Sequence, residues 1–194
     1  MCSKGPPWES SGAMDTLRGT LLVAAPTLLD PNFQRTVVLV TEHTDEGAMG
    51  LVLNRPTATT VADAAPELEA LTGPEELVHQ GGPVQPQAVV VLAEFADPER
   101  AAHVVMGDIG FVRADADLQR AGVETRRGRV YAGYAGWGPG QLEDELAEEA
   151  WIIEPPTREE IFTLEPAELW ASVLRRKGHR YALLATMPPD PSLN

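Results

Sequence analysis

Residue types that support acid–base chemistry gather in two short parts of the chain. Glu42, His43, Asp45 and Glu46 lie within five consecutive positions, and Asp30 precedes them in a segment that contains two prolines. Carboxylates and imidazoles transfer protons near neutral pH when the fold brings them into one pocket. Asp30, His43 and Glu46 therefore define one functional hypothesis, an acid–base enzyme of unrecognised type.

A glycine-rich segment, Tyr131 to Glu143, has the composition of a ligand-binding loop, with glycines at 133, 136, 138 and 140. Loops of this kind bind phosphate when they lead from a strand to a helix N-terminus. Here Gly140 is followed by Gln-Leu-Glu rather than Lys-Ser/Thr, and the dinucleotide glycine spacing is absent. Carboxylates in the first helical turn would also repel a phosphate. We therefore predict a structural turn with no cofactor, and we expect Trp137 and Trp151 in the core.

Nucleophilic catalysis and metal binding have little support in the sequence. Four of the five serines and the single cysteine, Cys2, lie near the chain ends, and no Gly-x-Ser-x-Gly motif occurs. The histidines, at 43, 79, 103 and 179, show no His-x-x-x-His spacing. Glu42 and His43 would point to opposite faces of a strand, so they cannot readily share one ion. We predict no metal site.

The charge balance restricts the partners that the chain can bind. Among its 194 residues, 29 are Asp or Glu and 15 are Lys or Arg, for a net charge of −14. This excess repels nucleic-acid phosphates and anionic lipids, so we predict no general binding to nucleic acid and none to membranes. Two basic clusters would allow a local DNA contact if they formed one exposed stripe: Arg126, Arg127 and Arg129, and Arg175, Arg176 and Lys177.

The predicted strands and helices, which must position these residues, indicate one α+β domain with a predominantly antiparallel sheet. Runs rich in Val, Leu and Thr predict strands over 20–25, 36–43, 49–53, 88–95, 104–112 (a pair), 129–137 and 181–185. Apolar spacing and turn signals predict helices over 60–71 (broken at Pro66), 115–121, 141–151 and 166–177.

The ends of the chain lack periodicity. We predict a disordered extension over 1–18, a single domain over 19–187 and a disordered tail over 188–194, with Met14 as an alternative start to Met1. The sequence has one cysteine, no apolar run of roughly 18–20 residues and no targeting signal. These features predict a cytoplasmic location.

Four blocks of the sequence occur in an order that resembles the YqgE/AlgH family of bacterial proteins. They are Pro26–Phe33, Glu46–Gly50 continuing to Asn54-Arg-Pro56, Gly81–Val84, and Tyr131–Glu145 followed by Trp151. The resemblance extends from about Gly19 to Ala185. It implies a bent or bifurcated, predominantly antiparallel β-sheet, partly barrel-like and surrounded by helices, in a bacterial cytosolic protein. The family has no assigned reaction or catalytic residues, and its name comes from an association with transcriptional control of alginate production.

Three functional hypotheses follow from the sequence. We expect a non-enzymatic regulatory or binding protein for a protein partner or small ligand; the alternatives are the acid–base enzyme and a transcriptional regulator that contacts DNA through the basic clusters. The candidate surface for a ligand or partner consists of Asp30, Asn32, Phe33, Glu46, Asn54, Gly82, Gly136, Gly138 and Gly140. The competing interpretation is that Asp30 and Asn54 only stabilise turns.

Overall fold

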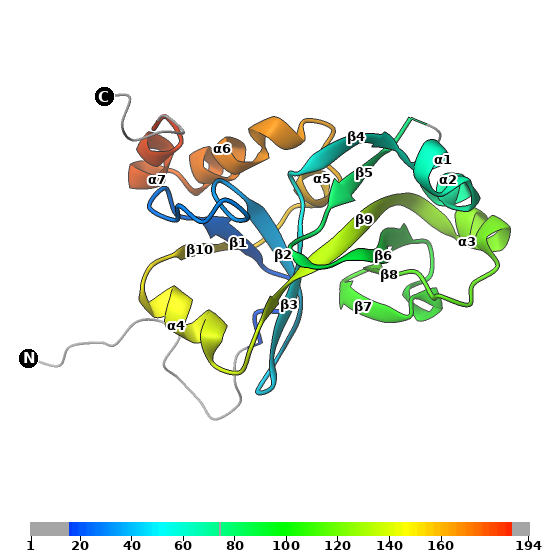
Figure 1. The fold of residues 1–194 in the computed structure, drawn as a ribbon, viewed down its shortest axis with the longest axis horizontal. Helices are drawn as coiled ribbons and strands as arrows, with labels where there is room; N and C mark the ends of the chain where they lie inside the picture. The colour runs from blue at the N-terminus through cyan, green and yellow to red at the C-terminus, as the bar shows by residue number, and fades with distance from the viewer. Residues whose placement is uncertain (1–15, 74, 188–194) are drawn as a thin grey trace, which may run out of the picture.

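The structure is a computed structural model that describes residues 16–73 and 75–187 (Figure 1). Of the predicted terminal segments, 1–18 and 188–194, only residues 16–18 lie within this range. No helix of the described residues is long and apolar enough to cross a membrane.

The described strands form one ten-stranded sheet, with the main order β10-β1-β2-β3-β9-β6-β8-β7 and with β5 joining β4 to β9. All pairings are antiparallel except that of β5 with β9. Within the described residues the sheet does not close into a barrel, and the predicted α+β fold is confirmed. The strands are β1 (Leu21–Ala24), β2 (Val37–Thr44), β3 (Gly47–Val52), β4 (Pro56–Thr60), β5 (Leu77–Gln80), β6 (Val84–Phe95), β7 (His103–Met106), β8 (Ile109–Phe111), β9 (Thr125–Trp137) and β10 (Trp151–Glu154).

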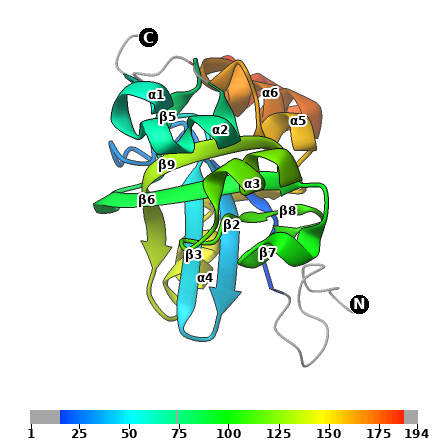
Figure 2. The ribbon, with the colours of Figure 1, turned by 90° about the vertical axis from the view of Figure 1, so that its right-hand side faces the viewer.

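The long strand β9 joins the two halves of the sheet. Its first part pairs with β6, with Val91 opposite Val130, and its last residues pair with β3, with Ala48 opposite Trp137. Between these parts Gly133 has φ +71°, a conformation that favours glycine. Figure 2 shows the consequence, because β6 and the first part of β9 run across the direction of β2 and β3, whereas the last part of β9 runs along β3. The sheet is therefore bent at the middle of β9.

Helices cover both faces of the half-sheet that contains β1 (Figure 1). Leu21 and Val23 pack in a core with Trp170 of α6, whereas Leu22 and Ala24 pack in a second core with Leu142 of α4. Burial of both faces explains why β1 is apolar at every position. The helices are α1 (Val61–Ala64), α2 (Glu69–Thr72), α3 (Leu118–Glu124), α4 (Gln141–Ala147), α5 (Arg158–Ile161), α6 (Pro166–Lys177) and α7 (His179–Leu184).

Two predicted elements are wrong. The helix predicted over 141–151 ends at Ala147, because Glu149 has φ +57° and the chain then enters β10 at Trp151. The strand predicted over 181–185 is helix α7, whose Tyr181 and Leu184 pack against the α6 core. Helix α3 also begins later than predicted, because Asp117 caps it by accepting the backbone N–H groups of Gln119 and Arg120. β4, β5, β10 and α5 had no counterpart in the prediction.

Candidate functional site

The Asn54-Arg55 pair holds the long loop between β1 and β2. Asn54 Oδ1 accepts the Val37 backbone N–H at 2.9 Å, and its Nδ2 donates to the Arg35 carbonyl at 2.9 Å. Arg55 Nη2 donates to the Gln34 carbonyl at 2.7 Å. These three bonds fix the backbone at positions 34, 35 and 37, directly after the first family block.

A second backbone segment, Gly81-Gly82-Pro83, passes directly against β9. A Cβ atom at Gly82 would lie 2.2 Å from the carbonyl carbon of Tyr134, and one at Gly81 would lie 2.2 Å from the Gly133 oxygen. No side chain fits at either distance, so the turn requires two glycines. The strand before it is fixed as well, because Gln80 N donates to the Arg55 carbonyl at 2.8 Å.

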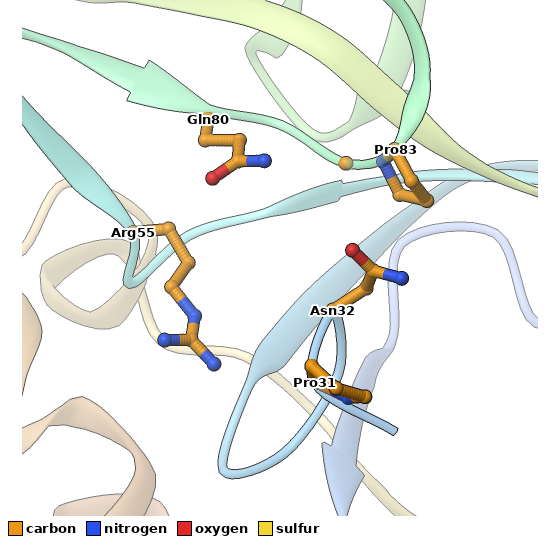
Figure 3. A pocket seen from close by; sticks show the side chains of 6 residues that line it. Pro31, Asn32, Arg55, Gln80 and Pro83 are labelled. Atoms are coloured by element: carbon orange, nitrogen blue, oxygen red, sulfur yellow. The ribbon is translucent and has the colours of Figure 1, made fainter.

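A small pocket lies where these segments meet (Figure 3). Its volume is about 80 Å³, enough for a group of a few heavy atoms. The side chains of Asn32, Arg55 and Gln80 supply its polar groups, as Figure 3 shows, and two prolines complete the wall. The residues that line it are Pro31, Asn32, Arg55, Gln80, Gly82 and Pro83.

The pocket carries one positive charge. Arg55 is half-buried, and within the described residues no carboxylate lies within 4.0 Å of its guanidinium nitrogens. The neighbouring Asp30 forms a local turn, in which Oδ1 accepts the backbone N–H of Asn32 at 2.8 Å. Asn32 and Gln80 are exposed, so solvent and solutes can reach the carboxamides.

The glycine-rich segment, which spans the end of β9 and the start of α4, adjoins an aromatic network. One oxygen of Glu145, Oε2, accepts the indole N–H groups of Trp137 and Trp151, at 2.9 and 2.7 Å. Phe33 contacts both indoles, with ring centroids 6.1 and 5.6 Å away. Gln141 donates to the other Glu145 oxygen, at 2.9 Å. Both tryptophans are buried, as expected.

The turn that leads into α4 completes this network. Gly138 N donates to Gln141 Oε1 at 3.0 Å, and Gly140 adopts the left-handed conformation just before the helix. Gly136 lies within β9 opposite Met49. Gly136, Gly138 and Gly140 of the candidate surface therefore shape a strand end and a helix start.

The proposed acid–base residues do not come together. His43 lies near the end of β2, whereas Asp30 lies in the loop between β1 and β2, where its side chain accepts the Asn32 N–H. Glu46 lies in the β2–β3 turn, where its N–H donates to Thr44 Oγ1. His43 has other partners: Nδ1 accepts the N–H of Leu17 at 3.1 Å, so Nε2 carries the proton that contacts Glu143 at 2.7 Å.

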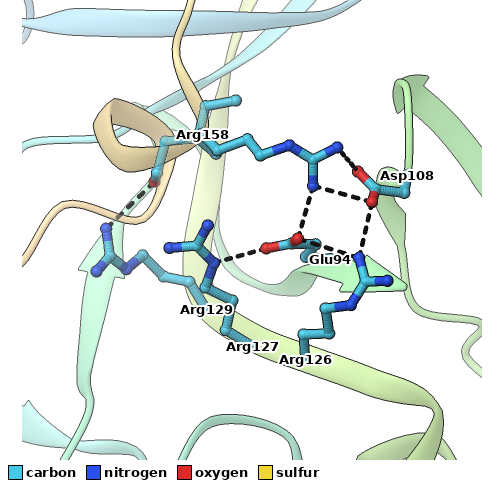
Figure 4. Close-up of polar contacts among 7 residues, drawn as sticks. Glu94, Asp108, Arg126, Arg127, Arg129 and Arg158 are labelled. Carbon is cyan, nitrogen blue, oxygen red and sulfur yellow. Dashed lines mark hydrogen bonds and ion pairs between the residues drawn. The ribbon is translucent and has the colours of Figure 1, made fainter. Parts of the chain in front are cut away.

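The first basic cluster forms part of an ion network around the buried carboxylate of Glu94 (Figure 4). Arg127 Nε lies 2.6 Å from Glu94 Oε2, and Arg158 of α5 lies 2.6 Å from Oε1. Arg126 and Arg158 also reach Asp108, at 3.0 and 2.8 Å. Burial raises the pKa of Glu94, but the hydrogen bond and charge of Arg127, with Arg126 and Arg158, bring the pKa below its ordinary value. The hydrogen bond from Arg158 likewise lowers the pKa of Asp108.

The two basic clusters do not form an exposed stripe of free cations. Arg129 is buried, pairs with Glu76 at 2.8 Å and donates to the Thr163 carbonyl. In the second cluster, Arg176 lies 2.8 Å from Glu160, and Lys177 pairs with Glu154. Most of these cations therefore neutralise local carboxylates instead of forming a free positive surface.

Two buried polar side chains lie side by side in the interior. His79 of β5 and Tyr131 of β9 have ring centroids 5.8 Å apart. His79 Nδ1 contacts the Leu77 carbonyl at 3.0 Å, whereas Nε2 has no hydrogen-bond partner among the described residues. Burial, and then the charge of Arg129, lower the pKa of His79 to about 4. Burial raises the pKa of Tyr131 to about 12.

The nine residues of the candidate surface thus lie in several places. Asn32 and Gly82 line the pocket, Asn54 and Asp30 shape the loop beside it, and Phe33 belongs to the aromatic network. Sequence reasoning missed Arg55 and Gln80, although Arg55 stands inside a family block and Gln80 directly precedes one. Across the residues that the structure describes, no group of three His, Cys, Asp or Glu side chains could hold a metal ion.

The fold and the pocket define the class of protein: an α+β domain whose bent sheet brings three loops together around a small polar pocket. A family model described as AlgH-like (DUF179) matches residues 21–182. A UPF0301 protein of Streptomyces coelicolor is 44% identical, over 93% of this chain and 97% of its own length. A UPF0301 protein of Thermobifida fusca is 40% identical, over 92% and 96%. The chain belongs to the AlgH-like family.

Solved structures share this fold. The crystal structure of a Corynebacterium diphtheriae protein has a TM-score of 0.79 and 28% identity, and covers 87% of this chain and 91% of that one. The solution structure of the AlgH protein from Pseudomonas aeruginosa has a TM-score of 0.69 and 29% identity, with 92% and 98% covered. The family expected from the sequence blocks is therefore confirmed.

Proposed function

We propose that the protein is a non-enzymatic binding protein with a regulatory role, and that it recognises its ligand or partner at the pocket between the three loops. The observation that supports this proposal is the origin of the pocket. Five of its six residues come from three separate family blocks, Pro26–Phe33, Asn54–Pro56 and Gly81–Val84, and Gln80 adjoins the third.

The pocket also has the chemistry and rigidity of a recognition site. Asn32 and Gln80 present carboxamides, which both donate and accept hydrogen bonds, and Arg55 donates only. The bonds from Asn54 and Arg55 hold the loop in place before any ligand arrives. Walls that are already ordered reduce the entropy lost on binding.

The alternatives have weaker support. An acid–base enzyme needs its groups in one place, and the side chains of Asp30 and His43 have separate partners, the Asn32 N–H and Glu143. A DNA-binding stripe needs accessible cations, and Arg129 is buried while its neighbours are ion-paired. The proposed role therefore involves neither nucleic acid nor membrane, and we infer a cytoplasmic location from the single cysteine, Cys2.

The test is affinity capture from a native lysate of Streptomyces coelicolor, whose UPF0301 protein is 44% identical to this chain. The bait is the wild-type chain, the double variant Asn32→Ala/Gln80→Ala, or Gln87→Ala, which changes an exposed residue outside the pocket. Mass spectrometry reads both proteins and small molecules in each eluate.

We expect one species to be retained by the wild-type chain and by Gln87→Ala but not by the double variant. The purified species should then bind the wild-type chain with one-to-one stoichiometry. The proposal is wrong if the double variant retains everything that the wild-type chain retains.

A further inference from the structure

Arg55 differs from most arginines of the described residues because it lacks a carboxylate partner. Arg35 is also half-buried and lacks one, but its guanidinium lies over the Trp170 ring, 4.5 Å from the centroid. Arg126, Arg127, Arg129, Arg158 and Arg176 each have a carboxylate partner. Within the described residues Arg55 has none, although it is half-buried in a chain of net charge −14. A partly buried cation is stabilised by an anionic partner, so the pocket favours a ligand that supplies the missing charge.

The groups around Arg55 suit an oxygen ligand. Its guanidinium has five N–H donors, and the contact with the Gln34 carbonyl uses one amino arm. The carboxamides of Asn32 and Gln80 line other sides of the same pocket and add further donors (Figure 3). Pro31 and Pro83 line the remaining sides.

We propose, on the basis of the binding role above, that this pocket takes a carboxylate group, which Arg55 holds with the carboxamides of Asn32 and Gln80. A planar guanidinium matches a carboxylate by two parallel hydrogen bonds. The pocket has one cation, which suits one singly charged group better than a phosphate dianion, and its volume of about 80 Å³ accommodates a carboxylate. The carboxylate belongs to a small organic acid or to the C-terminus of a peptide.

The test is nuclear magnetic resonance of the ¹⁵N-labelled full chain, with the Arg55 Nε–H and Gly82 N–H signals as reporters. The probes are sodium propanoate, neutral propanamide, inorganic phosphate, N-acetyl-diglycine and N-acetyl-diglycine amide. Propanoate should shift both signals saturably in the millimolar range, while propanamide leaves them in place and phosphate binds more weakly. The two diglycine probes separate the sources: much tighter binding of the free acid than of propanoate indicates a peptide C-terminus, and equal binding indicates a small acid.

Variants link the effect to the proposed contacts. Arg55→Gln should weaken propanoate binding at least about tenfold, as expected for loss of a charge-assisted hydrogen bond, and Arg113→Gln, an exposed arginine elsewhere, should not change it. Arg55→Lys keeps the positive charge but cannot form two parallel hydrogen bonds, so we expect an intermediate loss of propanoate affinity. If Arg55→Gln does not fold, Gln80→Ala replaces it as the test, because Gln80 is exposed.

Other outcomes separate this inference from the proposed function. If propanamide shifts the Gly82 signal as strongly as propanoate does, the ligand is neutral and the carboxylate assignment is wrong, while the binding role stands. If no probe shifts the reporters but capture from the lysate still depends on Asn32 and Gln80, the carboxylate assignment is again overturned on its own. If capture also ignores the pocket, both proposals fail.

Discussion

Trp151 donates its indole N–H to the carboxylate of Glu145, which lies six residues earlier, at a distance of 2.7 Å. The bond joins the first residue of β10 to helix α4 across the turn at Glu149. The same carboxylate oxygen also accepts from Trp137 at the end of β9. One acidic side chain thus connects a helix with two strands and fixes the chain reversal that brings β10 against β1.

Removal of this carboxylate should destabilise the protein. Glu145→Ala leaves the indole N–H groups of Trp137 and Trp151 without their acceptor, and hydrogen bonds to charged groups contribute about 1.5–3 kcal/mol each. We expect the free energy of unfolding in urea to fall by about 2–4 kcal/mol. Glu148→Ala, an exposed change directly after the same helix, should cost under about 0.5 kcal/mol. Equal losses in both variants would contradict the structural role of Glu145.

Glu94 should be the most sensitive member of the ion network. Glu94→Gln removes the buried carboxylate that Arg127 and Arg158 share, so we expect a clear loss of stability, although the partial exposure of both arginines limits its size. Asp97→Asn provides the control, because its exposed pair with Arg100 at 3.8 Å contributes little. Thermal unfolding followed by circular dichroism compares the two variants. A smaller loss for Glu94→Gln than for Asp97→Asn would show that the network contributes nothing.

The buried His79 predicts a loss of stability in mild acid. Its pKa is about 4 in the folded state against 6.5 for an ordinary histidine, so the unfolded state binds the proton more tightly. The stability that a neutral His79 allows is fully present above pH 6.5. As the pH falls toward 4, the free energy of unfolding decreases progressively, by roughly 3 kcal/mol in total.

This dependence is measured as the free energy of unfolding between these pH values. His79→Gln removes the titrating group and should flatten the profile, whereas His179→Gln changes an exposed histidine and should keep the wild-type slope. Parallel profiles for the wild-type chain and His79→Gln would argue against a buried neutral His79.

Asn54 should be needed to keep the β1–β2 loop ordered. Asn54→Ala leaves the Val37 N–H and the Arg35 carbonyl without their partners, which costs about 1–3 kcal/mol for each buried group. Hydrogen exchange at the Val37 amide should accelerate markedly, because its acceptor is gone. Asn32→Ala, in the same loop but exposed, should leave that amide protected. Unchanged protection in Asn54→Ala would mean that another group orders the loop.

Replacement by alanine should destabilise the protein strongly at Gly82 and hardly at all at Gly136. Gly82→Ala places a Cβ atom 2.2 Å from the Tyr134 carbonyl carbon, so we expect loss of several kcal/mol or failure to fold. Gly136→Ala meets its nearest neighbour at 3.5 Å and has ordinary strand backbone, so its stability should stay within about 1 kcal/mol of wild type. Urea unfolding compares them, and a tolerated Gly82→Ala would contradict the observed approach of the two backbones.

The fold was predictable where local pattern and tertiary packing agree. The apolar run at 21–24 and the stripe of α6 predicted their elements, because burial acts directly on those side chains. The α4 region misled prediction, since Leu142, Leu146 and Ala150 keep helical spacing beyond the point where Glu149 ends the helix. Tyr181 to Leu184 form a helix through packing against α6, and no local signal indicates that contact.

The candidate site was predictable only in part, for a similar reason. Asn32 and Gly82 stand in turns whose residue types indicate loops, so sequence alone could single them out. Arg55 and Gln80 become neighbours through the pairing of β4 with β5, where Pro56 lies opposite His79. A pairing between residues more than twenty positions apart leaves no periodic signal in either segment.

The position of β1 has a consequence for the order of folding during synthesis. β1 lies between β2 and β10, and Leu21 pairs with Glu154. While a ribosome is still making the middle of the chain, one edge of β1 has no strand to pair with, although its side chains are wholly apolar. Because β10 is made late, the pairing of β1 with β10 can form only after most of the chain has been synthesised. We therefore expect the native sheet to be completed only near the end of translation, with the apolar β1 protected in some other way until then.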